Sequence, residues 1–337
     1  MSGGTSIGVR LRNQLLAIGA RETTFQRRRF ESGAPRTRAH LENVGAHFLI
    51  GYHMALHNPR QVDVKSLDNI VPLFRGFAYE GAAMALAVHD GLTFNGRRFW
   101  EVFSASHGDD HIYMMHVGAG WAMARIPWLR WRMTWYLSHF DDLLRWLLVD
   151  GYGFHQGYFH PQRYLYAMRH DRAIGARGYQ ARAFDQGLGR SLWFVTCANP
   201  RRISAIIGNM AQERHADLWS GVGLAATYAG GVSAEILDEL REIAGTQAIH
   251  LAQGAVFAAA ARHRAGNVVP YTFDACRLLT GLSVEDASDV AEQARLGLPQ
   301  SLESHQPAYE GWRGAIRQRL AMRRPVAELS NEIGFTE

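Results

Sequence analysis

The sequence contains very few cysteines, which limits how its fold can be held together. Only Cys197 and Cys276 occur among the 337 residues. They stand alone, whereas the cysteines of zinc sites and redox motifs occur in close pairs. Isolated cysteines are typical of a reducing compartment. We therefore expect a cytoplasmic protein without a cysteine-based metal site.

Long apolar runs and targeting signals are also missing. The most apolar stretch, residues 251–261, is followed at once by Arg262. It is well short of the roughly 18 residues that a membrane-spanning helix needs. The first 30 residues show no signal-peptide pattern. We expect no membrane span.

Motifs of several enzyme classes are absent. The Gly-x-Gly sequences at 187–189 and 221–223 lack the strand–turn–helix context of a nucleotide loop. No serine nucleophile elbow occurs. The aspartate pairs at 109–110 and 141–142 lack the third aspartate of a terpene-cyclase motif. These absences argue against Rossmann-type hydride transfer, kinase chemistry, serine hydrolysis and pyrophosphate chemistry.

Positive charge is unevenly distributed along the chain. Residues 1–40 carry eight arginines and two glutamates, a net charge of +6, whereas the whole chain has +5, so the remainder sums to −1. We interpret residues 1–39 as a basic N-terminal arm with a short helix near residues 10–18. The arginines at 27–29 could contact an acidic partner, nucleic acid or a carrier protein, but we expect a solvated arm and no nucleic-acid binding.

Glycine recurs at helix-repeat spacing in the rest of the chain, where apolar residues are abundant. Successive copies are 30, 37, 39, 30, 34 and 33 residues apart, each inside an apolar helical run and most followed four residues later by a small residue. Such a pattern favours close packing of helix on helix. The copies centre on Gly51, Gly81, Gly118, Gly157, Gly187, Gly221 and Gly254.

The repeat length predicts an all-α protein of about seven αα-hairpins, with a spacing like that of tetratricopeptide repeats. Strand signals are nearly absent. We expect one helical repeat domain over residues 40–325 and a C-terminal tail over residues 326–337. The sequence leaves open whether the array is an open superhelix or a closed α/α ring.

Glu80 is the first candidate catalytic residue. It lies on an apolar helix face, where an ionised carboxylate is costly unless it is paired. The equivalent position is polar before four other repeat glycines, whereas Val117 breaks the pattern, and these polar side chains either converge on a shared channel or hydrogen-bond locally. Asp185 is a second candidate, although a structural ion pair with Arg182 or Arg190 is an alternative. The candidate substrate-binding residues are Gln156, Gln186, Gln253, Trp121 and Tyr158.

The 16 histidines include two groups, at 107–116 and 155–160. Imidazole is a common metal ligand and a ready acid or base near neutral pH. Spacings of five residues prevent either group from clamping one ion from a single helix face, so a metal would need ligands from several helices. The alternative is satisfied core or surface histidines. His116 and His155 are candidate catalytic residues, and the candidate metal ligands are His111, His155, His160 and Glu80.

Six segments together resemble a known family. They are GFAYEGAAMALA at 76–87, HVGAGWA at 116–122, DGYGFHQGYFH at 150–160, FDQGLGRSLWF at 184–194, DLWSGVG at 217–223 and LAQGA at 251–255. The chain is similar over most of residues 41–320 to bacterial proteins of a domain-of-unknown-function family encoded in enediyne natural-product gene clusters.

This resemblance implies a role in building a polyketide-derived enediyne or a related metabolite, with a hydrophobic polyene as the ligand. It brings no catalytic residue or cofactor. Two hypotheses follow: an enzyme that acts on the polyene in a helical channel, or a non-catalytic repeat scaffold or chaperone for the intermediate or for partner biosynthetic enzymes. An oxidative step would call for a redox metal ion, because no organic cofactor motif is visible.

Overall fold

A computed structural model describes residues 13–93, 98–298 and 306–323 of the chain. These residues form 17 α-helices and several short 3₁₀ and π segments, without a β-strand among them. The all-α prediction is therefore confirmed. Within the same residues no helix combines the length and apolar character needed to cross a membrane. The predicted C-terminal tail lies outside the described residues, as do residues 10–12 of the short helix predicted near residues 10–18, and residues 13–16 of that helix are helical.

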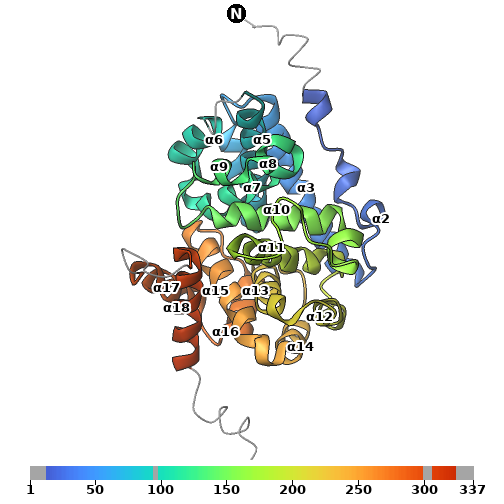
Figure 1. Cartoon of the computed structure of the whole chain (residues 1–337), viewed down its shortest axis with the longest axis vertical. Coiled ribbons are helices and arrows are strands. Elements are labelled where there is room, and N and C mark those ends of the chain that lie inside the picture. The colour runs from blue at the N-terminus through green and yellow to red at the C-terminus, as the bar shows by residue number, and fades with distance from the viewer. Residues whose placement is uncertain (1–12, 94–97, 299–305, 324–337) are drawn as a thin grey trace, which may run out of the picture.

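Seven long helices, which we call the inner helices, pack side by side in chain order (Figure 1). In Figure 1 the array runs from α3, α5 and α7 at the top, through α10 and α11, to α13 and α15 below. Each carries one of the repeat glycines. The inner helices are α3 (Pro35–His57), α5 (Pro72–Thr93), α7 (Ile112–Arg125), α10 (Trp146–Phe159), α11 (Tyr179–Val195), α13 (Gln212–Tyr228) and α15 (Ala248–Arg264).

Shorter elements connect the inner helices. In the second half they form an outer layer, where α12 packs on α14 and α14 on α16. The C-terminal pair α17 (Val284–Leu296) and α18 (Ala308–Arg323) packs against α15. The remaining helices are α2 (Phe25–Arg28), α4 (Val64–Asp68), α6 (Arg98–Phe103), α8 (Pro127–Trp131), α9 (Met133–Leu137), α12 (Pro200–Gly208), α14 (Ala234–Ala244) and α16 (Pro270–Thr280).

Helix starts follow the capping signals in part. Asn199 accepts a hydrogen bond from the backbone N–H of Arg202, and Pro200 opens α12, as its position predicts. Ser283 caps α17 in the same way. Aspartate is a common N-cap residue, and the pair at 109–110 stands before α7, which predicts a cap there. That prediction is wrong, because those residues form a 3₁₀ turn and His111 precedes α7 without a side-chain cap.

The repeat glycines mark the closest approach between neighbouring inner helices. A Cβ at Gly187 would lie 2.0 Å from the carbonyl oxygen of Asp150 on α10, and one at Gly189 would lie 2.0 Å from that of Leu218 on α13. In this Gly-x-Gly pair the first glycine thus contacts the preceding inner helix and the second glycine contacts the following one. An added Cβ would fall between 1.8 and 2.2 Å from a neighbouring carbonyl oxygen at Gly51, Gly81, Gly118, Gly120, Gly151, Gly153, Gly221, Gly223 and Gly254 as well.

This pattern corrects two details of the repeat. In α7, α10, α11 and α13 the close contacts fall at two glycines, at positions i and i+2, rather than at one. The copy in α10 is Gly151 with Gly153, whereas Gly157 packs against the side chain of Ser191. With Gly151 as the reference, the spacings from Gly118 and to Gly187 become 33 and 36 residues, which is more regular than 39 and 30.

The two ends of the array are joined by side chains, which favours the closed alternative over the open superhelix. The buried Arg262 guanidinium on α15 donates to the carbonyl oxygen of Tyr228 at 2.6 Å and to that of Leu73 on α5 at 3.1 Å. The imidazole Nε2 of His40 on α3 lies 2.7 Å from the carbonyl oxygen of Ala229. The first inner helices therefore contact the last ones.

The segment before α3 is packed against the array. Phe25 and Phe30 are buried, and the Phe30 ring meets the Tyr158 ring edge-on at 4.9 Å between centroids. The Arg28 side chain is 13% exposed, pairs with Glu22 and lies 4.9 Å above the centre of the Phe159 ring. The prediction of a solvated arm is therefore wrong for these residues, because aromatic side chains anchor the segment across the inner helices.

Candidate functional site

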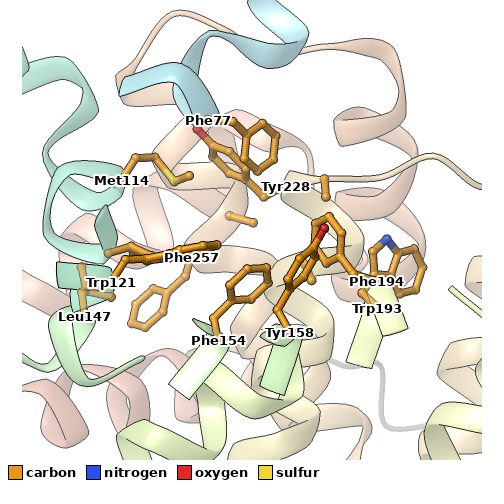
Figure 2. Close-up of a cluster of buried hydrophobic side chains, with 14 of the residues drawn as sticks. Phe77, Met114, Trp121, Leu147, Phe154, Tyr158, Trp193, Phe194, Tyr228 and Phe257 are labelled. Carbon is orange, nitrogen blue, oxygen red and sulfur yellow. The ribbon is translucent and has the colours of Figure 1, made fainter. Parts of the chain in front are cut away.

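An apolar cavity lies along the axis of the helical array. It has two small lobes with free volumes of about 50 and 40 Å³, and Arg190, Leu224 and Tyr228 line both. The space is narrow, and its walls combine aromatic with aliphatic side chains. In Figure 2 labelled side chains from six inner helices gather in this region. They are Phe77, Met114, Trp121, Leu147, Phe154, Tyr158, Trp193, Phe194, Tyr228 and Phe257.

Glu80 on α5 contributes a carboxyl group to the wall of the larger lobe. Its side chain is 2% exposed, and its Oε1 has no hydrogen-bond partner among the described residues. The indole N–H of Trp121, which lines the same lobe, is likewise unpartnered within them. Glu80 thus presents an unsatisfied polar atom next to the apolar space.

The environment of Glu80 favours its protonated form. Burial raises the pKa of Glu80 to about 7; the Arg190 charge opposes the rise, Asp150 adds to it and the Trp121 indole again opposes it. Burial dominates because a carboxylate surrounded by aromatic walls loses its hydration. Near neutral pH this side chain can therefore both give and take a proton.

Arg190 enters the cavity as part of a buried ion pair. Its guanidinium donates to the Asp150 carboxylate, and both side chains are almost fully buried. The Gln186 amide donates to the same carboxylate at 2.9 Å and to the Tyr309 hydroxyl at 3.1 Å. A buried charge is tolerated only when it is paired and hydrogen-bonded. The pair therefore supplies a fixed dipole rather than a free positive charge.

Helix α18 closes this side of the cavity, with Tyr309 and Trp312 lining the smaller lobe. The fully buried Arg313 guanidinium donates to Asp217 at 2.6 Å, to Glu310 at 3.1 Å and, through Nε, to the Gln253 amide oxygen at 3.1 Å. Sequence reasoning missed this role, because Asp217 and Gln253 lie on helices distant in the chain.

The five candidate substrate-binding residues divide into three groups. Trp121 and Tyr158 line the larger lobe. Gln186 and Gln253 are buried in the polar network that joins the inner helices to α18, and Gln186 Oε1 and Gln253 Nε2 have no hydrogen-bond partner among the described residues. Gln156 lies elsewhere, where its amide donates to the Tyr164 hydroxyl at 2.9 Å.

The predicted histidine sites do not converge. His111 stacks on Tyr79 with 4.0 Å between ring centroids, and His116 packs edge-on against Trp100 at 5.0 Å. His155 lies between Trp121 and Phe159, where burial lowers its pKa to about 3.

His160 is exposed and opens onto an outer cleft. Among the described residues no three His, Cys, Asp or Glu side chains come together as a metal site. The candidate ligand set of His111, His155, His160 and Glu80 is therefore not assembled in this structure.

Asp185 forms an ion pair, with a partner that the sequence did not indicate. Arg214 on α13 donates to both of its carboxylate oxygens, at 2.9 and 2.6 Å. Arg182 pairs with Asp217 instead, and Arg190 with Asp150. Asp185 borders an outer cleft rather than the axial cavity, which places it away from Glu80.

Comparison with known proteins identifies one family domain that contains the whole helical array. A family model described as "Protein of unknown function (DUF1702)" matches residues 8–320. The chain belongs to this family. The match spans the inner helices and nearly all of α18. The axial cavity and the helix that closes it are therefore parts of one family domain. No curated protein and no solved structure matches the chain.

The arrangement therefore offers apolar walls with the carboxyl of Glu80 beside them. Aromatic faces supply most of the contact area and also attract positive charge. Glu80 is the acid or base available at the wall, and the Arg190 pair with Asp150 is the nearest fixed dipole. Within the described residues no group of three His, Cys, Asp or Glu side chains that could hold a metal ion lies around this cavity.

Proposed function

We propose that this protein binds a linear polyene of polyketide origin in its axial cavity, as a step in the biosynthesis of an enediyne or a related metabolite. The observation that carries the proposal is the narrow two-lobed cavity, with aromatic walls drawn from most of the inner helices. These walls favour an apolar ligand over a charged one, and the lining side chains move apart to admit a long chain, because the free volume is small. The sequence resemblance supports the biosynthetic setting.

In this proposal Glu80 is the catalytic acid and base. The protonated carboxyl gives its proton to one carbon of the polyene, and the resulting carboxylate removes a proton from another carbon. The outcome is a shifted double bond, which is balanced without any co-reactant. The pKa of about 7 suits both halves of the exchange near neutral pH. Aromatic walls stabilise the positive charge that develops on the chain.

A second candidate function is a non-catalytic holder of the polyene. The observation that favours it is the separation of the histidines, which leaves Glu80 as the one carboxyl on the cavity wall outside an ion pair among the described residues, since Glu22 on the same wall pairs with Arg28. A holder needs only the apolar space. Both functions predict binding, and they differ in whether the bound chain changes.

The test is the Glu80→Gln variant, which keeps the side-chain volume and removes the acid. The absorption spectrum of a polyene released by a polyene-forming polyketide synthase is followed after mixing with either protein. An enzyme is expected to shift the absorption maximum, and the variant to bind the polyene and leave the spectrum constant. Equal spectral change with both proteins removes Glu80 from the mechanism, and no change with either protein leaves the holder.

A further inference from the structure

A second, chemically different cleft lies on the outer face of the array. It forms between the α8–α9 segment and the connection from α10 to α11, has a volume of about 910 Å³ and is open to solvent. Four arginines line it, namely Arg130, Arg163, Arg169 and Arg172. The connection itself, residues 160–178, carries four arginines and one aspartate, a net charge of +3. This cleft shares no lining residue with the axial cavity.

The four arginines are not engaged by acidic side chains. Among the described residues none of them forms an ion pair, whereas the buried Arg190, Arg214 and Arg313 each hold a carboxylate. Arg163 instead lies over the ring of its neighbour Tyr164 at 5.1 Å. Unpaired guanidinium groups around a concave surface create a strong attraction for anions. Arginine forks in particular match phosphate oxygens.

The single acidic residue in the cleft is already occupied. The Asp171 carboxylate accepts hydrogen bonds from the Tyr152 hydroxyl at 2.9 Å, the Tyr164 hydroxyl at 2.8 Å and the backbone N–H of Ala173 at 2.9 Å. It is buried beneath the arginines at 5% exposure. Asp171 therefore fixes the floor of the cleft and leaves the guanidinium groups above it without a partner.

An aromatic face borders the same cleft. Trp131, at the end of α8, lines it and is 74% exposed, although it is among the largest apolar side chains in the chain. An indole in this setting offers a flat surface on which a planar base can stack. Phosphate-binding forks and a stacking surface thus occur side by side.

We propose that this cleft binds a polyphosphorylated nucleotide, with its phosphates on Arg163, Arg169 and Arg172 and its base against Trp131. Four unpaired arginines match a ligand with several phosphates better than a single phosphodiester. Side chains hold the phosphates here, so no glycine-rich loop is needed. Coenzyme A thioesters and free nucleoside triphosphates share this chemistry. A flat anionic membrane fits less well, because Arg130 is partly buried within the concave surface.

The test is calorimetric titration of the full chain with coenzyme A, ATP and inorganic pyrophosphate at low and high salt. Arg163→Gln and Arg172→Gln are each expected to weaken binding of all three about tenfold. Trp131→Ala is expected to weaken coenzyme A and ATP about tenfold and leave pyrophosphate unchanged. Arg132→Gln is the matched control, because Arg132 is exposed beside Trp131 but does not line the cleft. It should bind as the wild type does.

Each outcome decides the proposal. Tighter binding of coenzyme A than of ATP, with the stated losses, identifies a thioester as the ligand source, and the reverse order identifies a free nucleotide. Absence of saturable binding up to about 1 mM for every probe overturns the proposal, as does binding that the cleft variants leave unchanged. A third outcome also overturns it: the wild-type protein binds phosphatidylserine vesicles, the cleft variants do not, and no nucleotide binds to the wild type. Glu80→Gln should not alter nucleotide affinity, so the proposal stands or falls independently of the axial cavity.

Discussion

Replacing Gly187 with valine is expected to lower the free energy of unfolding by about 4 kcal/mol or more, or to prevent folding. The smallest added atom, Cβ, would already fall 2.0 Å from the Asp150 carbonyl oxygen and 2.6 Å from the backbone nitrogen of Phe154. Both atoms belong to the backbone of α10, so no side chain can turn aside. The two inner helices would have to separate, and the buried pair of Arg190 with Asp150 joins the same two helices.

The measurement is equilibrium unfolding in urea followed by the helical circular dichroism signal. Gly208→Ala is the matched control, because Gly208 is also helical but no atom lies within 4 Å of the position that its Cβ would take. Alanine there should leave stability unchanged or raise it by up to about 1 kcal/mol. A Gly187→Val protein within about 1 kcal/mol of the wild type would contradict the close-contact account of the repeat.

Glu80→Gln is expected to make the protein more stable than the wild type at pH 8, by up to about 3 kcal/mol. The folded protein holds the Glu80 proton up to a pKa of about 7, against an ordinary value of 4.5. The stabilisation that comes from keeping Glu80 protonated in the folded protein is therefore fully present below about pH 4.5, and it is lost as the pH rises through about 7. Glutamine is neutral at every pH and escapes this loss.

The check is the midpoint of urea unfolding at pH 5 and at pH 8 for both proteins. Asp90, whose pKa burial raises to about 6, acts in the same direction, but it is present in both proteins and cancels in the comparison. The exposed Glu213 provides a control, since Glu213→Gln should keep the wild-type pH dependence. Parallel pH profiles for the wild type and Glu80→Gln would show that Glu80 is ionised in the folded protein.

The helical array was predictable because close helix packing leaves a local mark in the sequence. Glycine is needed wherever two backbones touch, so its spacing revealed the length of the repeat. The pair at i and i+2 escaped notice, since only the structure shows that Gly118 meets one neighbour and Gly120 the other. Closure of the array was not predictable, because it depends on hydrogen bonds from Arg262 to carbonyl groups far away in the sequence.

The site was predictable to a smaller extent. Glu80 stood out because a carboxyl group on an apolar helix face needs an explanation within its own helix. Arg190 and Asp150 did not stand out as a pair, because their separation of 40 residues carries no signature in a single sequence. The histidine clusters were misleading for the related reason that nearness in sequence does not place side chains on the same side of a helix. His116 and His155 accordingly pack against different aromatic groups.

Binding of a fluorescent conjugated tetraene fatty acid tests the central claim most directly. The wild-type protein is expected to enhance its fluorescence in a saturable way. Leu224 lines both lobes, and Leu224→Trp places an indole where they meet. This variant is expected to abolish the fluorescence enhancement. Its midpoint of urea unfolding is expected to equal that of the wild type, which shows that it is folded. Equal binding by the folded variant, or no binding by the wild type, would contradict the account of the axial cavity as a polyene site.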